Sequence, residues 1–515
     1  MVEARRSPTA RRTGLLLSTR PTEAIFGPAL VLMSGRALGF IAAFAVPLVL
    51  ARVFSQHEFG TYKQVFLIYS TLFGIVQAGM AESLYYFLPA EKDRKGRYIV
   101  NVLMVLGGLG LAALLLLYSQ QDRIAALLNN AALAPYLVLT GIYLVLMLMS
   151  LVLEIVMTAE KQHVSASFAY ALTDLGRAIL FLVPVFFFGG LFWLLLGAIA
   201  FGFGRLAYTL FYLKREFGTG LQADHDLMKK QLGYALPFGL AGLIEVVQIN
   251  FHMYVVSWYF DAATFAIYSV GCLQLPITDF LMTSTSNVVM VQMREKLRAG
   301  DLAAVVAIWL DGVRKLALVL FPMIGILLVL AHELIVVMFT DSYASAVPVF
   351  IVWTIGMLLA TILSDSVLRV YAENRFLIIQ NFIRLAVLAA LIHWFLALFG
   401  LVGAVLVTLL ANLVARSLGL MRVKTLLGVR FGQLLPWKSL AGVFATAAGA
   451  AVPVLLLKAT RPVEDFLQLA IGGTLYVITY YLLLLWLGPL HADEKHELVR
   501  WTQMPMVRLR RALKA

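Results

Sequence analysis

Long apolar stretches separated by short loops make up nearly the whole chain, and its basic residues fall almost entirely on alternate loops. Each stretch has roughly 20 residues, enough to cross about 30 Å of hydrocarbon as a helix. We count fourteen, beginning near Ala24, Tyr62, Tyr98, Pro135, Val164, Leu191, Gly233, Ala262, Leu316, Val347, Leu377, Val402, Ser439 and Phe466. The pattern predicts an all-α polytopic membrane protein, because a helix satisfies its own backbone hydrogen bonds in lipid.

The basic residues also predict which side each loop faces. Short cytoplasmic loops retain Lys and Arg, since moving a cation outward during insertion is disfavoured. With the N-terminus inside, 31 of the 41 basic residues fall on inner segments, five on outer loops and five within spans. Both termini are then cytoplasmic. The net charge of +13 is explained by topology and by contact with anionic headgroups, so no nucleic-acid partner is expected.

Composition and motifs argue against other classes of protein. Only 13% of residues are charged, where soluble domains carry about 25%. The single cysteine, Cys272, permits neither an intramolecular disulfide nor a cysteine zinc cluster. No nucleotide-binding or metal-ligand spacing is found, and we interpret His252 and His332 as interfacial or packing residues. We therefore expect no enzyme activity, no cofactor, no metal site and no cleavable signal peptide.

A short internal repeat indicates two lobes. The pattern Phe-x4-Phe-x2-Tyr occurs at 54–62 and at 260–268, and Pro28 and Pro237 precede the two copies at a similar offset. Duplication predicts two parallel six-helix lobes in a pseudo-two-fold arrangement, plus two C-terminal helices. The expected divisions are 1–23 (cytoplasmic basic segment), 24–213 (N-lobe), 214–232 (cytoplasmic linker), 233–426 (C-lobe), 427–490 (last two spans) and 491–515 (cytoplasmic tail).

Several ionisable residues lie inside the predicted spans. Charge at mid-membrane is costly and therefore faces protein or water rather than lipid. The deep cations are Arg36, Arg177, Arg205 and Arg384, and the deep anions are Asp174, Glu245 and Asp279. Glu82, Glu154 and Asp365 lie nearer the inner ends, and Arg416 can reach the interface by snorkelling.

Each deep charge has a functional and a structural interpretation. Asp174 and Arg177 are i,i+3 neighbours and can simply pair. Arg36 and Glu245 each follow a proline of the repeat by eight residues, so they are either cleft residues or an inter-lobe ion pair. Guanidinium groups pair bidentately with phosphate, and we predict that the four arginines bind a diphosphate headgroup. The three deep carboxylates either bind H⁺ or Na⁺ or neutralise the arginines.

Two prolines are candidate hinges for rocking of the lobes. Pro276 and Pro322 fall in the eighth and ninth spans, where a missing backbone N–H makes bending cheap. A static kink is the alternative for each.

Three segments resemble the oligosaccharide (polysaccharide-precursor) flippases of the multidrug/oligosaccharidyl-lipid/polysaccharide exporter superfamily. They are the turn 52–62 (RVFSQHEFGTY), the opening 232–237 (LGYALP) and the stretch 336–343 (VVMFTDSY). The resemblance implies transfer of an undecaprenyl-diphosphate-linked oligosaccharide across the bacterial cytoplasmic membrane, with H⁺ or Na⁺ as candidate coupling ions. It also implies membrane lipids as partners, with a polysaccharide polymerase and a chain-length regulator as candidate protein partners in surface polysaccharide or O-antigen synthesis.

Three other functions compete with this interpretation. A drug/cation antiporter of the same superfamily normally has twelve spans and an acidic cavity. A peptidoglycan-precursor flippase shares the fourteen spans and the cationic cavity, so only substrate assays separate it. A membrane polysaccharide polymerase or ligase would need a substantial outer loop, which the sequence lacks.

Overall fold

The computed structural model describes residues 44–487 except 78, 92, 461 and 462, together with 490, 494 and 495. Arg36, Pro28, the basic segment 1–23 and most of the tail lie outside the described residues. The described part is α-helical and contains no β-strand. Nine of its helices are long and apolar enough to cross a membrane, or eleven if two bent pairs are counted as spans. The all-α, polytopic prediction is confirmed.

The N-lobe begins in the described part with a short helix, Phe44–Val53. Its remaining elements are α2 (Gln56–Gln77), α3 (Ser83–Phe87), α4 (Lys95–Ser119), α5 (Gln121–Leu127), η1 (Ala131–Leu133), α6 (Ala134–Ser150), α7 (Val152–Ala159), α8 (His163–Phe188) and α9 (Gly190–Phe217). A 3-10 turn, η2 (Gly218–Gly220), leads out of the lobe.

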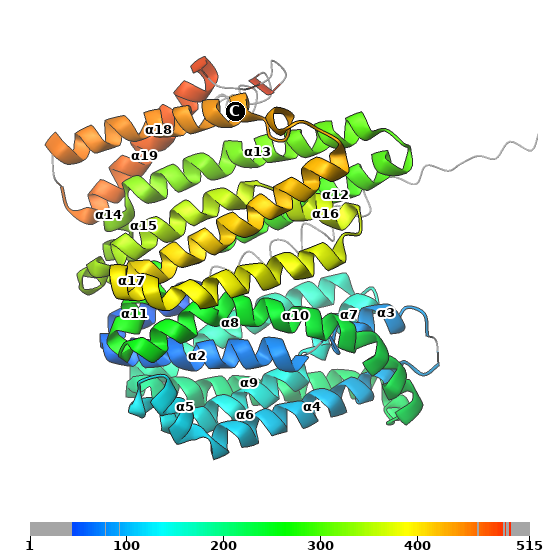
Figure 1. Ribbon diagram of the computed structural model, residues 1–515. Helices are drawn as coiled ribbons and strands as arrows, with labels where there is room; N and C mark the ends of the chain where they lie inside the picture. The colour runs from blue at the N-terminus through cyan, green and yellow to red at the C-terminus, as the bar shows by residue number, and fades with distance from the viewer. Residues whose placement is uncertain are drawn as a thin grey trace, which may run out of the picture.

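The C-lobe runs from α10 (His225–Tyr259) through α11 (Ala262–Gly271), α12 (Pro276–Arg298), α13 (Leu302–Val329), α14 (Ala331–Phe339), η3 (Asp341–Ala346), α15 (Val347–Gly356), η4 (Met357–Thr361) and α16 (Ser364–Val370) to α17 (Asn374–Leu427). After η5 (Phe431–Gln433), α18 (Trp437–Thr460) and α19 (Asp465–Leu487) pack together on the outside of this lobe, against α13 and α14 (Figure 1).

Helix α17 supplies two of the predicted spans. Its backbone leaves the helical region at Gly400, where φ is +57°. A side chain at Gly403 would overlap the carbonyl of Phe395, so the two arms lie close on either side of this turn. Glycine is required at Gly400 because L residues rarely adopt a positive φ. Counting α17 as two spans raises the eleven to twelve. With α2 and the helix 44–53, which covers the end of the first predicted stretch, each of the fourteen predicted stretches has a helix in the described part of the chain.

Two helices begin earlier than hydropathy predicts. Helix α13 begins at Leu302 rather than near Leu316, and α10 begins at His225 rather than near Gly233. Asp301 and Asp224 cap these helices by accepting a hydrogen bond from the backbone N–H three residues on. A run of apolar residues marks only the part of a helix that lies in hydrocarbon. The capped first turns of α10 and α13 lie in water, so hydropathy does not detect them. Most of the expected linker 214–232 is therefore helical.

The loops predicted as cytoplasmic lie together at one end of the molecule. Lys95 bonds Glu160 at 2.8 Å, and Arg97 bonds Asp224 at 3.1 Å, tying three inner loops of the N-lobe together. The Leu227 N–H and the Arg97 guanidinium hold the pKa of the Asp224 carboxyl below its ordinary value. We call this the inner end, and the end that holds α5, α11 and α14 the outer end (Figure 1).

Backbone irregularities recur at a fixed interval in the two lobes. Positive φ values occur at Asn129 and Thr340, at Lys161 and Ala372, and at Gly189 and Gly400, each pair 211 positions apart. Since non-glycine residues rarely adopt this conformation, three coincidences at one spacing support the duplication that the aromatic repeat indicates.

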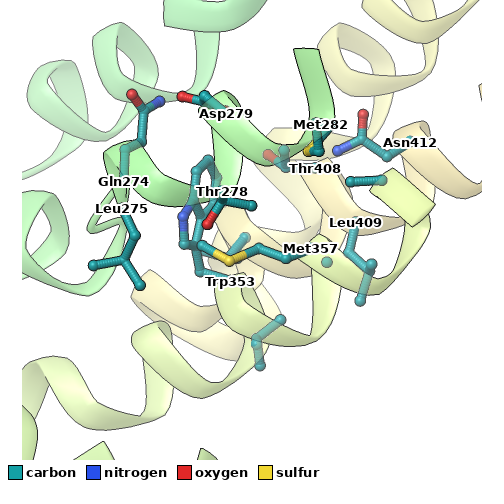
Figure 2. A pocket seen from close by; sticks show the side chains of 14 residues that line it. Gln274, Leu275, Thr278, Asp279, Met282, Trp353, Met357, Thr408, Leu409 and Asn412 are labelled. Atoms are coloured by element: carbon teal, nitrogen blue, oxygen red, sulfur yellow. The ribbon is translucent and has the colours of Figure 1, made fainter. Parts of the chain in front are cut away.

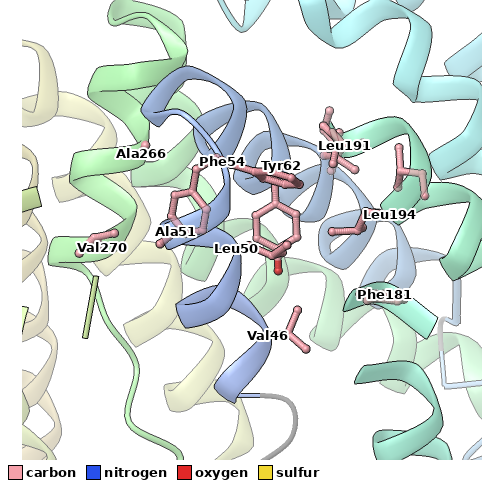
Figure 3. Packing of buried hydrophobic residues seen from close by; sticks show 14 of the residues in the cluster. Val46, Leu50, Ala51, Phe54, Tyr62, Phe181, Leu191, Leu194, Ala266 and Val270 are labelled. Carbon is pink, nitrogen blue, oxygen red and sulfur yellow. The ribbon is translucent and has the colours of Figure 1, made fainter. Parts of the chain in front are cut away.

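The lobes join at their outer ends. One apolar cluster crosses the lobe boundary there and includes Phe54 and Tyr62 of the N-lobe with Ala266 and Val270 of the C-lobe (Figure 3). The two copies of the repeat thus pack on each other, through α2 and α11. Further inward, the cluster around Leu148 lies in the N-lobe but includes Leu227 and Ala235 of α10, and a separate cluster around Trp309 lies within the C-lobe. Among the described helices, α7, α8 and α9 make no comparable contact with α12 to α17.

We call the contact between α2 and α11 at the outer end the outer seam. It requires glycine at Gly60, where a Cβ would overlap the carbonyl of Ala262 on α11. Gly60→Ala should lower the melting temperature of the purified protein in detergent, because overpacking costs about 1–3 kcal/mol. The matched control is Gly108→Ala in α4, which has no heavy atom within 4 Å and should be neutral or slightly stabilising. Equal melting temperatures for the two variants would contradict the account of this seam.

Candidate functional site

A buried ion pair joins α7 and α9 within the N-lobe. Arg205 of α9 donates through one guanidinium nitrogen to both carboxylate oxygens of Glu154 on α7, at 2.9 and 2.8 Å. The two side chains are only 10% and 3% exposed. Thr173 of α8 donates to the same carboxylate at 3.3 Å. Three helices are thereby joined through one carboxylate, and Arg205 is engaged by a counter-ion in this conformation.

The second N-lobe arginine is also paired. Arg177 bonds Asp174 on the same face of α8 at 2.9 Å. Its guanidinium acts electrostatically on the hydroxyls of Tyr143 and Tyr69, whose rings stack at 4.9 Å. Both N-lobe arginines therefore lie around one pair of tyrosines. Arg177 was predicted to bind an anion, and Asp174 was predicted to bind a cation or to neutralise an arginine. In this structure the two side chains neutralise each other.

The C-lobe repeats the buried pair of the N-lobe. Arg416 of α17 bonds Asp365 of α16 at 2.8 Å. These residues are 211 positions after Arg205 and Glu154, the same interval as the backbone irregularities. The C-lobe pair is more open, with side chains 23% and 39% exposed. The sequence predicts that Arg416 snorkels to the interface; the interval of 211 positions instead makes Arg416 and Asp365 the equivalents of Arg205 and Glu154, and the fold shows that each pair is bonded.

Arg384 differs from Arg177 and Arg205, the two N-lobe arginines of the predicted set that the structure describes. In the described part of the chain no carboxylate lies within ion-pair distance of it. With the amide of Gln248 oriented to satisfy its hydrogen bonds, the Gln248 oxygen accepts from Nε and a terminal nitrogen of Arg384 at 2.6 and 2.7 Å. Glu245 and Asp365 act on Arg384 only at longer range. Its charge is therefore incompletely neutralised by the described residues.

Glu245 lines a cavity between the lobes. This cavity of about 600 Å³ lies between α2 and α10, with Glu82 on the N-lobe side and Tyr234 at its inner part. Helix α10 bends by 47° between Pro237 and Gly242 beside the same cavity. The structure thus places Glu245 at the lobe boundary, while its predicted partner Arg36 lies outside the described residues.

Asp279 lies apart from the arginines, inside the C-lobe. A partly open cavity of about 210 Å³ is bordered by α12, α15, η4 and α17, and the exposed side chain of Asp279 lines it (Figure 2). Gln274, Thr278, Thr408 and Asn412 supply further polar side chains. The described residues contain no group of three or more His, Cys, Asp or Glu side chains arranged for a metal ion.

Two more cavities continue from this one toward the inner end. The second shares Met282 and Ala360 with the first and is lined by the Asp365–Arg416 pair. The third shares Met290 and Arg369 with the second and adds Arg294 and Arg298. The three cavities follow α12 to its inner end, and arginines line the last of them.

The two candidate hinge prolines occupy different settings. Pro276 begins α12 directly after a break at 272–275, where α11 and α12 meet at a 46° bend. Pro322 lies inside the continuous helix α13. A hinge function stays a prediction for both residues, and a break in the helix accompanies Pro276.

His252 has a packing environment rather than a catalytic one. It is buried, its Nδ1 lies 2.7 Å from the Tyr268 hydroxyl, and its ring contacts Trp353.

Arg52 lies at the outer end, where its guanidinium donates to the carbonyls of Val337 and Met338 on α14. Arg52 belongs to the turn 52–62, one of the segments that resemble the flippase family, and it thus joins the two lobes.

Comparison with known proteins identifies relatives of this arrangement. Residues 49–348 match the model of a family described as "Polysaccharide biosynthesis protein". No curated protein matches the sequence. A lipid II flippase, MurJ, in an inward closed conformation superposes with a TM-score of 0.70 at 15% identity, over 89% of this chain and 98% of that one.

Multidrug resistance transporters of the MATE family, within the MOP superfamily, also superpose. The inward-facing conformation matches with a TM-score of 0.60 at 14% identity, over 78% of this chain and 98% of that one. The outward-facing conformation matches with a TM-score of 0.51 at 14% identity, over 78% and 94%. At these identities the likeness establishes the fold.

The Glu154–Arg205 pair should contribute more to stability than its repeat-equivalent. Glu154→Gln leaves a buried guanidinium without a counter-ion, at a cost of about 3–5 kcal/mol. Asp365→Asn removes a more exposed partner and should cost about 1 kcal/mol or less. Thermal unfolding of the two purified variants measures the difference, and equal losses would show that burial does not separate the pairs.

Proposed function

The chain belongs to the polysaccharide biosynthesis protein family, and from that premise we propose that it moves a lipid-linked oligosaccharide with a diphosphate headgroup across the bacterial cytoplasmic membrane. Transport is by alternating access between the two lobes. The observation that carries the proposal is the combination of a closed outer seam with an incompletely neutralised arginine, Arg384, inside the C-lobe.

The distribution of contacts supports an inward-facing state. At the outer end one apolar cluster draws on both lobes. Toward the inner end α10 packs on the N-lobe cluster around Leu148, whereas α12 to α17 make no comparable contact with α7, α8 and α9 among the described helices. Polar contacts reinforce the outer seam, where Gln64 of α2 donates to Ser257 at 2.8 Å and Gln56 donates to the carbonyl of Ser342 at 2.5 Å. A substrate taken from the inner leaflet then enters between the inner halves of the lobes.

In this mechanism the diphosphate binds guanidinium groups while the prenyl tail stays in lipid. Arg384 receives the anion first, because Gln248 is its neutral partner and no carboxylate must be displaced. Arg177 also binds the diphosphate if its bond to Asp174 breaks. Arg36 is the proposed diphosphate ligand from the first span. Arg205 binds Glu154 so closely that its role in binding would require exchange of a buried partner.

A peptidoglycan-precursor flippase is the second candidate, favoured by the superposition over 89% of the chain on the lipid II flippase. Both substrates carry a diphosphate on a prenyl chain, so the arginines serve either one. Proteoliposomes loaded with each lipid separate the two functions. We expect transfer of the oligosaccharide lipid and little transfer of lipid II; the reverse preference would overturn the assignment of substrate.

Locking the outer seam should stop transport. With Cys272 replaced by alanine, Gln56→Cys and Ser342→Cys lie on facing lobes and can be joined by a short bifunctional thiol reagent. Joined protein should lose transfer of the lipid-linked oligosaccharide in proteoliposomes, because the outer ends can no longer separate. A reagent that cleaves the bridge should restore transfer.

The control bridge lies within one lobe. Glu58 and Leu191 contact each other in the N-lobe through a hydrogen bond of 2.9 Å, and joining cysteines at these positions should leave transfer unchanged. Full transfer by protein bridged across the seam would contradict alternating access.

Arg384→Ala should lower the initial rate of transfer about tenfold to a hundredfold, since hydrogen bonds to charged groups contribute about 1.5–3 kcal/mol. Arg384→Lys should retain part of the activity if charge dominates. The matched control is Arg215→Ala, which removes an exposed arginine at the inner end of α9. An unchanged rate for Arg384→Ala, at equal protein level, would remove Arg384 from the substrate site.

A further inference from the structure

We propose that the C-lobe cavity beside the Asp365–Arg416 pair binds the first sugar of the lipid-linked oligosaccharide. The inference rests on the proposed function and names the part of the substrate that this cavity recognises. The diphosphate stays with Arg384, next to the cavity.

The two lobes carry the same group of three interacting positions with different chemistry. In the N-lobe, Arg205 and Thr173 both donate to the carboxylate of Glu154. The equivalents 211 positions later are Arg416, Arg384 and Asp365. A second cation thus replaces a neutral hydroxyl beside the C-lobe ion pair. A purely structural pair has no need of the extra charge, which points to a ligand.

Two further differences make the C-lobe copy polar and open. Ser366 stands where the N-lobe has the buried Ile155, and Arg369 stands where it has Thr158. The side chain of Asp365 is also one methylene shorter than that of its equivalent. A cavity of about 280 Å³ results, and Asp365, Arg416, Ser366 and Arg369 line it.

Helix α12 supplies the opposite wall of this cavity with Thr283, Ser286 and Asn287. Thr283 and Asn287 are exposed, and in the described part of the chain neither side chain has a hydrogen-bond partner. The Ser286 hydroxyl lies 2.7 Å from that of Ser366 across the cavity wall. Polar side chains at membrane depth face water or protein rather than lipid, so this face of α12 borders a space that a polar ligand can enter.

The charges of the cavity favour a sugar over a metal ion or a phosphate. Two guanidinium groups, of Arg416 and Arg369, outnumber the one carboxylate, which disfavours a cation. The Asp365 carboxylate only accepts hydrogen bonds and repels an ionised phosphate, which offers it no donor. A sugar hydroxyl can donate to the carboxylate and accept from a guanidinium or an amide, so a ring with several hydroxyls matches both kinds of group.

The position of the cavity matches the connectivity of the substrate. The first sugar is bonded directly to the diphosphate, so its site must adjoin the diphosphate site. Asp365 and Arg416 act electrostatically on the Arg384 guanidinium, and Arg384 holds the repeat position of Thr173, which contacts the N-lobe pair. The volume of about 280 Å³ lies below the range of about 300–1,000 Å³ for whole ligand sites, which suits one ring rather than an oligosaccharide.

Displacement of radiolabelled undecaprenyl diphosphate from the immobilised full-length protein tests the cavity directly. The unlabelled competitors are undecaprenyl diphosphate and the same lipid bearing one N-acetylglucosamine or one galactose. For the wild type, at least one sugar-bearing lipid should displace the label at about tenfold lower concentration than the lipid without sugar, because a few additional hydrogen bonds supply that factor. We call this ratio the sugar preference.

Two variants change the cavity from opposite walls. Asn287→Ala should lower the sugar preference to about threefold or less, since it removes an amide that can both donate and accept. Ser366→Ile gives the C-lobe the N-lobe residue, fills the cavity and should abolish the preference. Arg384→Ala should weaken all three lipids by a similar factor and leave the preference unchanged.

The matched control is Gln292→Ala, which removes an exposed amide of the same helix that lines none of the three cavities along α12. It should keep the full sugar preference. Equal displacement by the lipids with and without sugar in the wild type would overturn the site. A preference that survives both Asn287→Ala and Ser366→Ile would overturn it as well.

Failure of this site and failure of the proposed function give different results. Transfer of the lipid-linked oligosaccharide in proteoliposomes without any sugar preference in binding rejects the cavity and keeps the flippase. A sugar preference that depends on Asn287, without transfer of any diphosphate lipid, keeps the cavity and rejects the flippase.

Discussion

The cost of charge in hydrocarbon governs the interior of this protein. A carboxylate or guanidinium inside the membrane must be paired or solvated, and most of those described are paired within one lobe. Glu154 with Arg205, and Asp365 with Arg416, hold helices of the same lobe together at repeat-equivalent positions. Because these ion pairs do not cross the lobe boundary, each lobe can move without breaking them.

The lobe boundary is held by a different kind of contact. At the outer end apolar side chains and hydrogen bonds from Arg52 and Gln56 join the lobes, and their separation exposes no unpaired intramembrane carboxylate. Such an interface can open and close at moderate cost. The duplicated aromatic turn therefore has a role in both copies, since each packs against the other at the point where the lobes meet.

Much of the architecture could be predicted from sequence, because hydropathy and basic loops report directly on the membrane. The starts of α13 at Leu302 and of α10 at His225 could not be predicted from hydropathy, since a capped first turn in water contains no run of apolar residues. The deep charges could be found as a set but not paired: only the fold brings Glu154 beside Arg205 or leaves Arg384 with Gln248. Asp279 and Asp174 look alike in sequence, and only the neighbouring helices distinguish a carboxylate with a counter-ion from one without. The interval of 211 positions makes Asp365 and Arg416 equivalent to Glu154 and Arg205, although it does not show that they bond each other.

Electron–electron distance measurements between spin labels on the two lobes test the central claim most directly. One pair of labels, at His57 and Asp341, spans the outer end, and a second pair, at Lys161 and Arg375, spans the inner end of the protein. The account predicts that added lipid-linked oligosaccharide lengthens the outer distance while the inner distance shortens. Distances that stay fixed, or that change in the same direction at both ends, would contradict rocking of two internally paired lobes.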